Sequence, residues 1–135
     1  MNCFLFNFGL LVLRAGLGGA MIVHGAQKLK IIMGGGAANW LNPLGFGAAQ
    51  SLYLAAFAEL CCSAFVIAGF FTRLSSAVLA FTMFVAAFVF LHSAPWDKKE
   101  LAFVFFIGFL ALSLLGGGEF SLSRWLFGHS KIAGL

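Results

Sequence analysis

The chain has 135 residues, of which 62% are hydrophobic and 9% are charged, and it carries a formal net charge of +4. A soluble domain has about 25% charged and 45–50% apolar residues, and a small domain keeps too much surface to hide a larger apolar share. The composition therefore excludes a soluble globular domain and indicates an integral membrane protein, whose length allows one domain over residues 1–135.

Long apolar runs divide the chain into four predicted transmembrane helices. Crossing about 30 Å of hydrocarbon takes roughly 20 mostly apolar residues in a helix. Runs of this length, each with at most one charged residue at its centre, predict helices over residues 4–29, 48–71, 74–93 and 99–117. The predicted fold class is all-α, an integral membrane four-helix antiparallel bundle.

The first predicted helix contains a single charge near its middle, Arg14. At about 100° per residue, Arg14, Gly18, Met21, Gly25 and Lys28 lie near one line along the helix. Small residues let a neighbouring helix approach closely, so this line is expected to face the bundle interior. An unpaired guanidinium at the centre of a membrane helix costs at least about 2.5–3.5 kcal/mol. Arg14 should therefore have a partner inside the bundle.

The second predicted helix supplies a candidate for that partner. Glu59 is the one acidic residue near the middle of a predicted span. It is part of a stripe of small and polar residues at helical spacing, together with Leu52, Ala55, Ala56, Cys62, Ser63 and Val66. Arg14 and Glu59 are similarly deep when counted from opposite helix ends. The sequence therefore predicts an Arg14–Glu59 ion pair, serving either as a functional site or as a device that fixes helix register.

The connections and the tail contain turn and interface residues. A Gly-, Asn- and Pro-rich stretch over residues 33–47 is predicted as the first loop, with Trp40 at the headgroup level. The spacing of Asp97 and Glu100 is typical of a capping box at the start of the fourth helix. Residues 124–127 are predicted to form a short interfacial helix after the last span.

Further polar residues lie near the predicted helix ends. In an antiparallel bundle the first and third helices end on the same side, so His24 and His92 are expected near one membrane face, with Lys28 and Glu100. Each histidine alone is typical of an interfacial residue, whereas the pair would form a proton-handling site. Lys28 has the position of a snorkelling charge, and Arg73 lies in a tight turn. Two histidines are too few for a metal site, so no metal is predicted.

Several short motifs follow one another over residues 12–123. They are Leu13-Arg14-x-Gly16, His24-Gly25-x-Gln27-Lys28-Leu29, Ala58-Glu59-Leu60, Gly69-Phe-Phe-Thr72-Arg73-Leu74, Ala86 followed by His92, Glu100, and Gly116-x-Gly118-x-x-Ser121-Leu122. This combination resembles the DoxX family of small four-helix membrane proteins. Two positions depart from the family pattern. Ser123 stands where the family usually has an acid, and Cys61-Cys62-Ser63 stands where a glycine pair commonly follows the glutamate.

The resemblance implies a protein of the bacterial cytoplasmic membrane and leaves two classes of function open. We expect an accessory subunit of a membrane redox or respiratory assembly that contacts quinone. The alternative is a quinone-linked oxidoreductase subunit acting on thiosulfate or thiols, so the two hypotheses differ in whether the chain is an enzyme. No intrinsic cofactor is expected, and quinone is the one cofactor considered. The sequence has no flavin fingerprint, CxxC or redox-metal motif, which weighs against an oxidoreductase that acts alone. The candidate ligand-binding or polar-cluster residues are Arg14, His24, Lys28, Glu59, Arg73, His92 and Glu100.

The expected partners are the lipid bilayer and either a larger membrane complex or further copies of the chain. The basic residues are spread along both predicted membrane edges without a basic stripe, which favours lipid headgroups and excludes nucleic acid. With four spans both termini share a side. Arg73, Arg124 and Lys131 lie on that side, and we expect it to be cytoplasmic.

Overall fold

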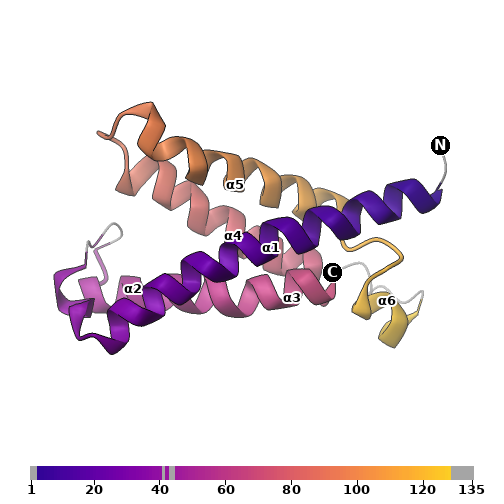
Figure 1. Ribbon diagram of the computed structural model, residues 1–135, viewed down its shortest axis with the longest axis horizontal. Coiled ribbons are helices and arrows are strands. Elements are labelled where there is room, and N and C mark those ends of the chain that lie inside the picture. The colour runs from indigo at the N-terminus through magenta and orange to yellow at the C-terminus, as the bar shows by residue number, and fades with distance from the viewer. Residues whose placement is uncertain (1–2, 41, 43–44, 129–135) are drawn as a thin grey trace.

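The computed structural model describes residues 3–40, 42 and 45–128, and these residues form helices and connecting turns without a strand. In chain order the elements are α1 (Cys3–Met33), the 3₁₀-helix η1 (Gly36–Asn39), α2 (Ala48–Phe57), the π-helix η2 (Ala58–Cys62), α3 (Ser63–Ala68), α4 (Thr72–Phe84), the π-helix η3 (Val85–Phe90), α5 (Trp96–Leu115) and α6 (Leu122–Phe127). The segments α2, η2 and α3 form one continuous rod, as do α4 and η3 (Figure 1). Lys131 lies outside the described residues.

Three of these rods are long and apolar enough to cross a membrane, namely Cys3–Met33, Ala48–Ala68 and Thr72–Phe90. This confirms the predicted class of an all-α membrane protein. The helix α5 has 20 residues, but the charged residues 97–100 near its start shorten its apolar part. Its role as the fourth span stays a prediction.

The predicted helix bounds need two corrections. α1 continues about one turn beyond the predicted end at residue 29. The predicted capping box is wrong, because α5 begins at Trp96 with Pro95 at its N-cap and no side chain capping it. Pro95 already has the extended backbone of an N-cap residue, with φ −63° and ψ 158°. Asp97 therefore falls within the first turn, where its carboxylate meets the positive end of the helix dipole.

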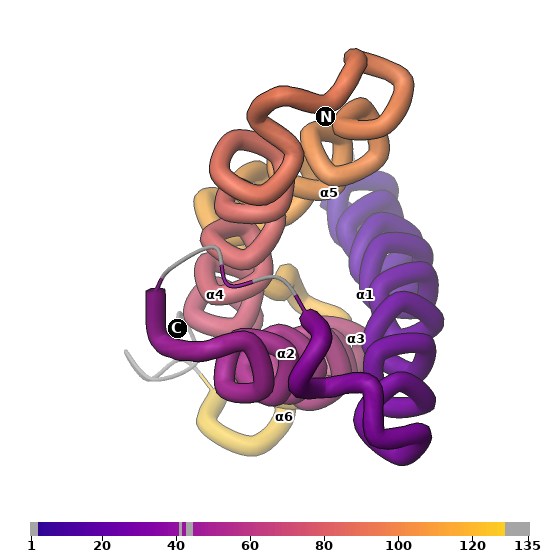
Figure 2. The backbone as a smooth tube through the Cα atoms, turned by 90° about the vertical axis from the view of Figure 1, so that its left-hand side faces the viewer, coloured from indigo at the N-terminus to yellow at the C-terminus, as the bar shows by residue number. Residues whose placement is uncertain are grey.

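The helices pack as two antiparallel pairs around a common interior (Figure 2). α1 lies along the α2–α3 rod, and α4 lies along α5. The α2–α3 rod and α4 meet at the turn between Ala68 and Thr72, and they diverge towards the end that holds η1 and the α4–α5 corner (Figure 1). The start of α1 and the helix α6 lie together at the opposite end, as expected for an even number of spans.

The interior is built from the two stripes that the sequence predicts. The buried residues of α1 include Arg14, Gly18, Met21 and Gly25, which confirms that this line faces the bundle. The buried residues of the second span include Leu52, Ala56, Glu59, Ser63 and Val66. Between the pairs lies an apolar core formed by Leu10, Met21, Val66, Leu79, Ala80, Met83, Phe105, Phe109 and Leu112.

Two glycines of α1 determine the distance between the first two spans and their axial register. A Cβ atom on Gly18 would lie 2.6 Å from Ile67 Cγ1, and one on Gly25 would lie 2.8 Å from Leu60 Cγ. Such distances leave no room for a side chain, so the backbones approach as they do at small-residue interfaces in membranes.

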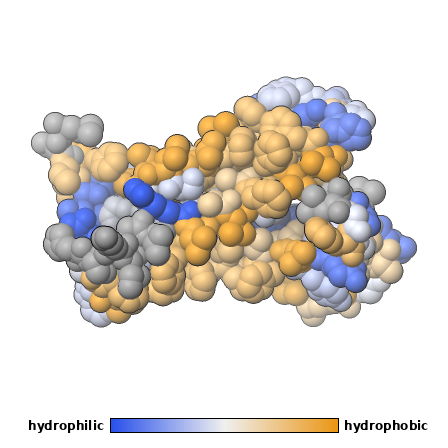
Figure 3. Space-filling view, turned by 180° about the vertical axis from the view of Figure 1, so that it is seen from behind, coloured by the Kyte–Doolittle hydropathy of each residue, from blue (hydrophilic) through white to orange (hydrophobic). Residues whose placement is uncertain are grey.

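The outside of the bundle is largely apolar. Many phenylalanine, leucine and valine side chains are exposed, as in other proteins that face lipid. Figure 3 shows one face that is mostly hydrophobic across its middle, with hydrophilic residues concentrated towards its two ends.

Candidate functional site

The acidic residue of the second span forms an ion pair with Lys28. Lys28 Nζ lies 2.8 Å from both Glu59 Oε1 and Glu59 Oε2, and the Glu59 side chain is only 1% exposed. Helical side chains lean towards the N-terminus of their own helix, so these two lean towards each other across an antiparallel contact. Lys28 therefore reaches into the bundle and does not snorkel outwards.

The predicted Arg14–Glu59 ion pair is wrong. The two stripes do face each other, but Gly25 is the residue of α1 that lies at the level of Glu59. A Cβ atom on Gly25 would be 3.1 Å from Glu59 Cβ. Arg14 is 11 residues earlier in the same helix, which is about 16 Å along its axis. The close approach at Gly18 and Gly25 sets this register and places Lys28 against Glu59.

Arg14 instead forms a hydrogen bond with the loop between α5 and α6. Its side chain is fully buried, and Nη2 donates a hydrogen bond to the carbonyl oxygen of Phe120 at 2.5 Å. Asn7, two turns earlier, accepts a hydrogen bond at Oδ1 from the backbone N–H of Glu119 at 3.0 Å. Non-helical backbone near lipid needs partners within the protein, and α1 supplies two of them.

Ser123 stabilises the turn between α3 and α4. Its Oγ accepts a hydrogen bond from the backbone N–H of Phe71 at 3.0 Å, and its own N–H donates to the carbonyl of Gly69 at 3.1 Å. Phe71 has a φ of 45° and is the one non-glycine residue with a positive φ among those described. The serine at the position where the family motif usually has an acid therefore supports a strained turn.

The two histidines have different neighbours. His24 lies one turn before Lys28, its ring meets Phe105 edge-on at 5.8 Å, and it is close enough to Glu59 to interact electrostatically. His92 is exposed beyond the end of η3, where Nδ1 lies 3.2 Å from the carbonyl oxygen of Val89 and Nε2 lies 2.8 Å from Ser93 Oγ. The His24 ring contacts α5, and the His92 ring contacts residues at the end of η3, so the contacts described do not join the two histidines and their cluster stays a prediction.

The seven candidate residues thus fall into three places. Lys28 and Glu59 come together between α1 and η2, and His24 lies one turn away with its ring against Phe105 of α5. Arg14 lies towards the opposite end of the bundle, as does Arg73, whose side chain covers Gly116. His92 and Glu100 are exposed at the corner between η3 and α5.

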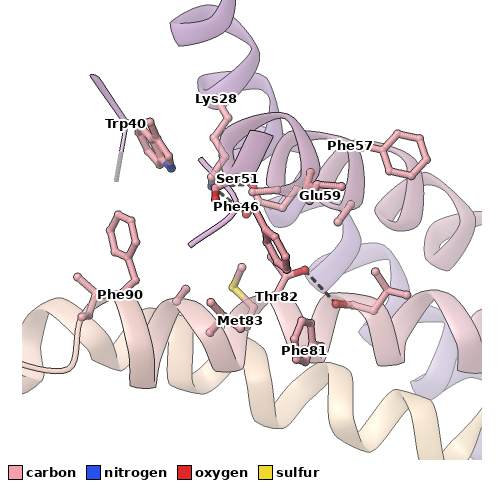
Figure 4. Close-up of a pocket in the computed structure, with 17 residues that line it drawn as sticks. Lys28, Trp40, Phe46, Ser51, Phe57, Glu59, Phe81, Thr82, Met83 and Phe90 are labelled. Carbon is pink, nitrogen blue, oxygen red and sulfur yellow. Dashed lines mark hydrogen bonds and ion pairs between the residues drawn. The ribbon is translucent and has the colours of Figure 1, made fainter. Parts of the chain in front are cut away.

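A cavity of about 560 Å³ lies beside the Lys28–Glu59 pair, between the divergent parts of the second and third spans (Figure 4). Its polar lining consists of Lys28, Glu59, Ser51 and Thr82. Apart from the indole N–H of Trp40, the remaining lining is apolar and consists of Trp40, Phe46, Leu54, Ala55, Phe57, Ala58, Val78, Phe81, Met83, Val85, Ala86, Phe90 and Leu91. Small-molecule sites in proteins occupy about 300–1,000 Å³ and are mostly apolar with a few polar groups. The cavity has the size and lining of such a site.

Both π-helices border this cavity. The η2 segment contributes Ala58 and Glu59, and the η3 segment contributes Val85, Ala86 and Phe90. A π-turn is an irregularity in an α-helix that is frequent at functional sites. The sequence analysis did not predict either π-turn, because the apolar residues in these segments fit an ordinary helix equally well.

The cavity is closed towards the end of the bundle and open at its side. Trp40 lies near Phe90 at the end of the bundle, with the ring centroids 6.0 Å apart (Figure 4), and its place at the headgroup level stays a prediction. At the side, Phe57 is 64% exposed and Phe81 is 60% exposed. Since this side belongs to the apolar outer surface, the opening faces the lipid.

The chemistry of the lining suits a mostly apolar ligand with few oxygen atoms. One ammonium, one carboxylate, two hydroxyls and the indole N–H of Trp40 are its side-chain polar groups. Within the described part of the chain, no group of three or more His, Cys, Asp and Glu side chains could hold a metal ion. The ammonium can donate to oxygen atoms of a bound molecule, whereas the Thr82 hydroxyl already donates to the carbonyl oxygen of Val78.

A bundle of membrane-spanning helices with an ion pair at the wall of a lipid-facing cavity defines a small multi-pass membrane protein. Comparison with known families matches residues 9–92 to DoxX. This match covers more than half of the chain and includes every residue that lines the cavity. The chain belongs to the DoxX family. No curated protein and no solved structure matches it.

Proposed function

We propose that the protein is an accessory subunit of a bacterial membrane redox or respiratory assembly, and that its cavity holds the head of a quinone. The observation that carries the proposal is the cavity of about 560 Å³ that opens towards lipid beside the Lys28–Glu59 pair. A quinone has an apolar ring, two carbonyl oxygens and a hydrophobic tail. The side opening gives that tail a route to the bilayer.

Lys28 is the residue expected to contact a quinone carbonyl. Its ammonium has three N–H groups, and the two oxygens of Glu59 engage it at 2.8 Å each. One N–H remains for an acceptor in the cavity. Because Lys28 and Glu59 neutralise each other, the site favours a neutral acceptor over an anion. The Glu59 carboxylate adds a group that can exchange a proton with a bound ligand.

The accessory role is favoured over an oxidoreductase that acts alone on thiosulfate or thiols. The adjacent cysteines Cys61 and Cys62 follow Glu59 directly, yet neither belongs to the lining of the cavity. A larger complex would then supply the electron donor. The family, together with the basic residues near the α1 start and α6 end of the bundle, supports a place in the bacterial cytoplasmic membrane with the termini inside.

Filling the cavity is expected to abolish quinone binding. Ala86 lies in the lining, so Ala86→Phe would occupy the space of the ring, whereas the control Ala64→Phe adds the same side chain at an exposed position on α3. Titration of the purified protein with a short-chain quinone should show at least about tenfold weaker binding for Ala86→Phe and unchanged binding for Ala64→Phe. Equal affinities for the two variants would contradict the assignment. The purified chain is also expected not to reduce quinone with thiosulfate or thiols, and turnover would favour the alternative.

A further inference from the structure

Among the described residues, the part of the bundle away from the cavity contains buried polar atoms without hydrogen-bond partners. They are Arg14 Nε and Nη1, Thr72 Oγ1 and Ser76 Oγ, with Ser63 Oγ nearer the middle of the bundle. Arg14 and Ser76 are 0% exposed, and Thr72 is 3% exposed. Buried polar groups in proteins are nearly always paired, so a cluster of open donors indicates a missing partner.

Within the described part of the chain, no side-chain carboxylate forms an ion pair with Arg14. The chain has four acidic residues. Glu59 pairs with Lys28, and Glu119 pairs with Arg124. Asp97 and Glu100 lie near the start of α5, at the other end of the bundle (Figure 1). The buried guanidinium therefore has one hydrogen-bond acceptor, the neutral carbonyl oxygen of Phe120. Burying a charge without a counter-charge is costly, so a further partner is expected.

The positive end of a helix adds to this charge. α4 begins at Thr72, and its N-cap residue Phe71 has no side chain that caps the helix, although the N–H of Phe71 itself donates to Ser123 Oγ. The free N–H groups and the dipole at a helix N-terminus attract anions. Ser76 lies one turn further along the same helix, so its open hydroxyl and that of Thr72 are on one face.

Two glycines connect Thr72 with Arg14. A Cβ atom on Gly117 would lie 2.7 Å from Thr72 Oγ1 and 2.9 Å from Ser121 Cβ. A Cβ atom on Gly69 would lie 2.7 Å from Ser121 Cβ and would overlap Arg14 Nη1. The Arg14 guanidinium and the start of α4 therefore both lie close to Ser121 in the α5–α6 loop. Because Gly69 and Gly117 have no side chains, nothing from these two residues fills the space between them.

We propose that a small inorganic anion of the chloride type binds here, between Arg14, Thr72, Ser76 and the N-terminus of α4. Each of the unpartnered atoms of Arg14, Thr72 and Ser76 is an N–H donor or a hydroxyl that can donate. The side chain of Arg14 is completely buried, which favours a free small anion over the phosphate of a lipid headgroup. This site is separate from the cavity and does not depend on the proposed function.

Chloride is expected to stabilise the folded protein. We would measure thermal unfolding of the full chain in detergent while sodium chloride replaces sodium gluconate at constant ionic strength. A ligand that binds the native state raises the midpoint with its concentration, and we expect a rise of at least about 3 °C. The variant Thr72→Val removes one donor and should lose most of this rise. The control Thr82→Val should keep it, because Thr82 Oγ1 already donates to Val78 O within α4.

Equal midpoints in chloride and gluconate would overturn the proposal and would leave water as the partner of these atoms. A chloride response retained by Thr72→Val would also overturn it. Stabilisation by anionic lipid vesicles without any response to chloride would assign the site to a headgroup and contradict a free anion. Crystals soaked in bromide provide an independent measurement, since an anomalous peak beside Arg14 is expected and a site without one would contradict the assignment.

Discussion

Replacing Lys28 with methionine is expected to destabilise the protein by about 3–5 kcal/mol, because the change leaves Glu59 buried without its partner. The Glu59 side chain is 1% exposed, and both of its oxygens contact Lys28 Nζ. The double variant Lys28→Met/Glu59→Leu should recover most of the loss, since apolar side chains of similar volume often replace a buried ion pair at little cost. Unfolding of the purified protein in detergent would measure the effect.

Lys30 provides the matched control for this prediction. It lies in the same turn of α1 and is exposed, so Lys30→Met should change the stability by no more than about 0.5 kcal/mol. If Lys28→Met is as stable as Lys30→Met, the ion pair does not neutralise Glu59. If a change at Arg14 rescued the stability of Glu59→Leu and a change at Lys28 did not, the result would support the Arg14–Glu59 pair that the sequence predicts.

A methyl group at Gly69 is expected to destabilise the fold by about 3 kcal/mol or more. Gly69 has a φ of 75°, which is unfavourable for any residue with a Cβ atom. The added Cβ atom would also overlap Arg14 Nη1 and lie 2.7 Å from Ser121 Cβ. Overpacking of this kind costs about 1–3 kcal/mol in addition to the backbone strain.

Gly16→Ala is the control for Gly69→Ala. Gly16 lies in α1, and a Cβ atom there would meet nothing within 4 Å. Alanine has a higher helix propensity than glycine, so this variant should be neutral or more stable by up to about 1 kcal/mol. Thermal midpoints of the two variants should therefore move in opposite directions or differ by several degrees. Equal midpoints would show that the α5–α6 loop does not press on Gly69.

The sequence was sufficient to predict the helices and the faces that they bury. Hydropathy and charge locate the spans, and the 3.6-residue period assigns Arg14, Gly18, Met21 and Gly25 to the interior. The same reasoning correctly requires an internal partner for Arg14. It could not identify that partner, because the partner is a backbone carbonyl in a loop more than 100 residues away.

The axial register of the helices could not be predicted. Helical periodicity shows which residues share a face, but it does not show how far one helix is shifted along another. Here the shift depends on tight contacts at Gly18 and Gly25, and it changes the partner of Glu59 from Arg14 to Lys28. A more useful signal was present in the sequence, since Lys28 lies on the same line of α1 as Arg14.

The cavity could not be predicted for a different reason. It arises where the second and third spans diverge, and such divergence is a property of how whole helices pack (Figure 1). The two π-turns that border it lie within apolar runs and leave no distinct pattern of residues. The polar groups near Lys28 could be found from the sequence, but the apolar space beside them required the structure.

Photolabelling with a light-activated quinone tests the central claim most directly. Membranes that contain the protein would be irradiated with the probe, and the labelled residues would be identified by mass spectrometry. We predict label on the cavity-lining residues within 51–58 and 78–91, and a marked loss of that label in Ala86→Phe but not in Ala64→Phe. Label confined to the outer face of α5, or label that is unchanged in Ala86→Phe, would contradict the account.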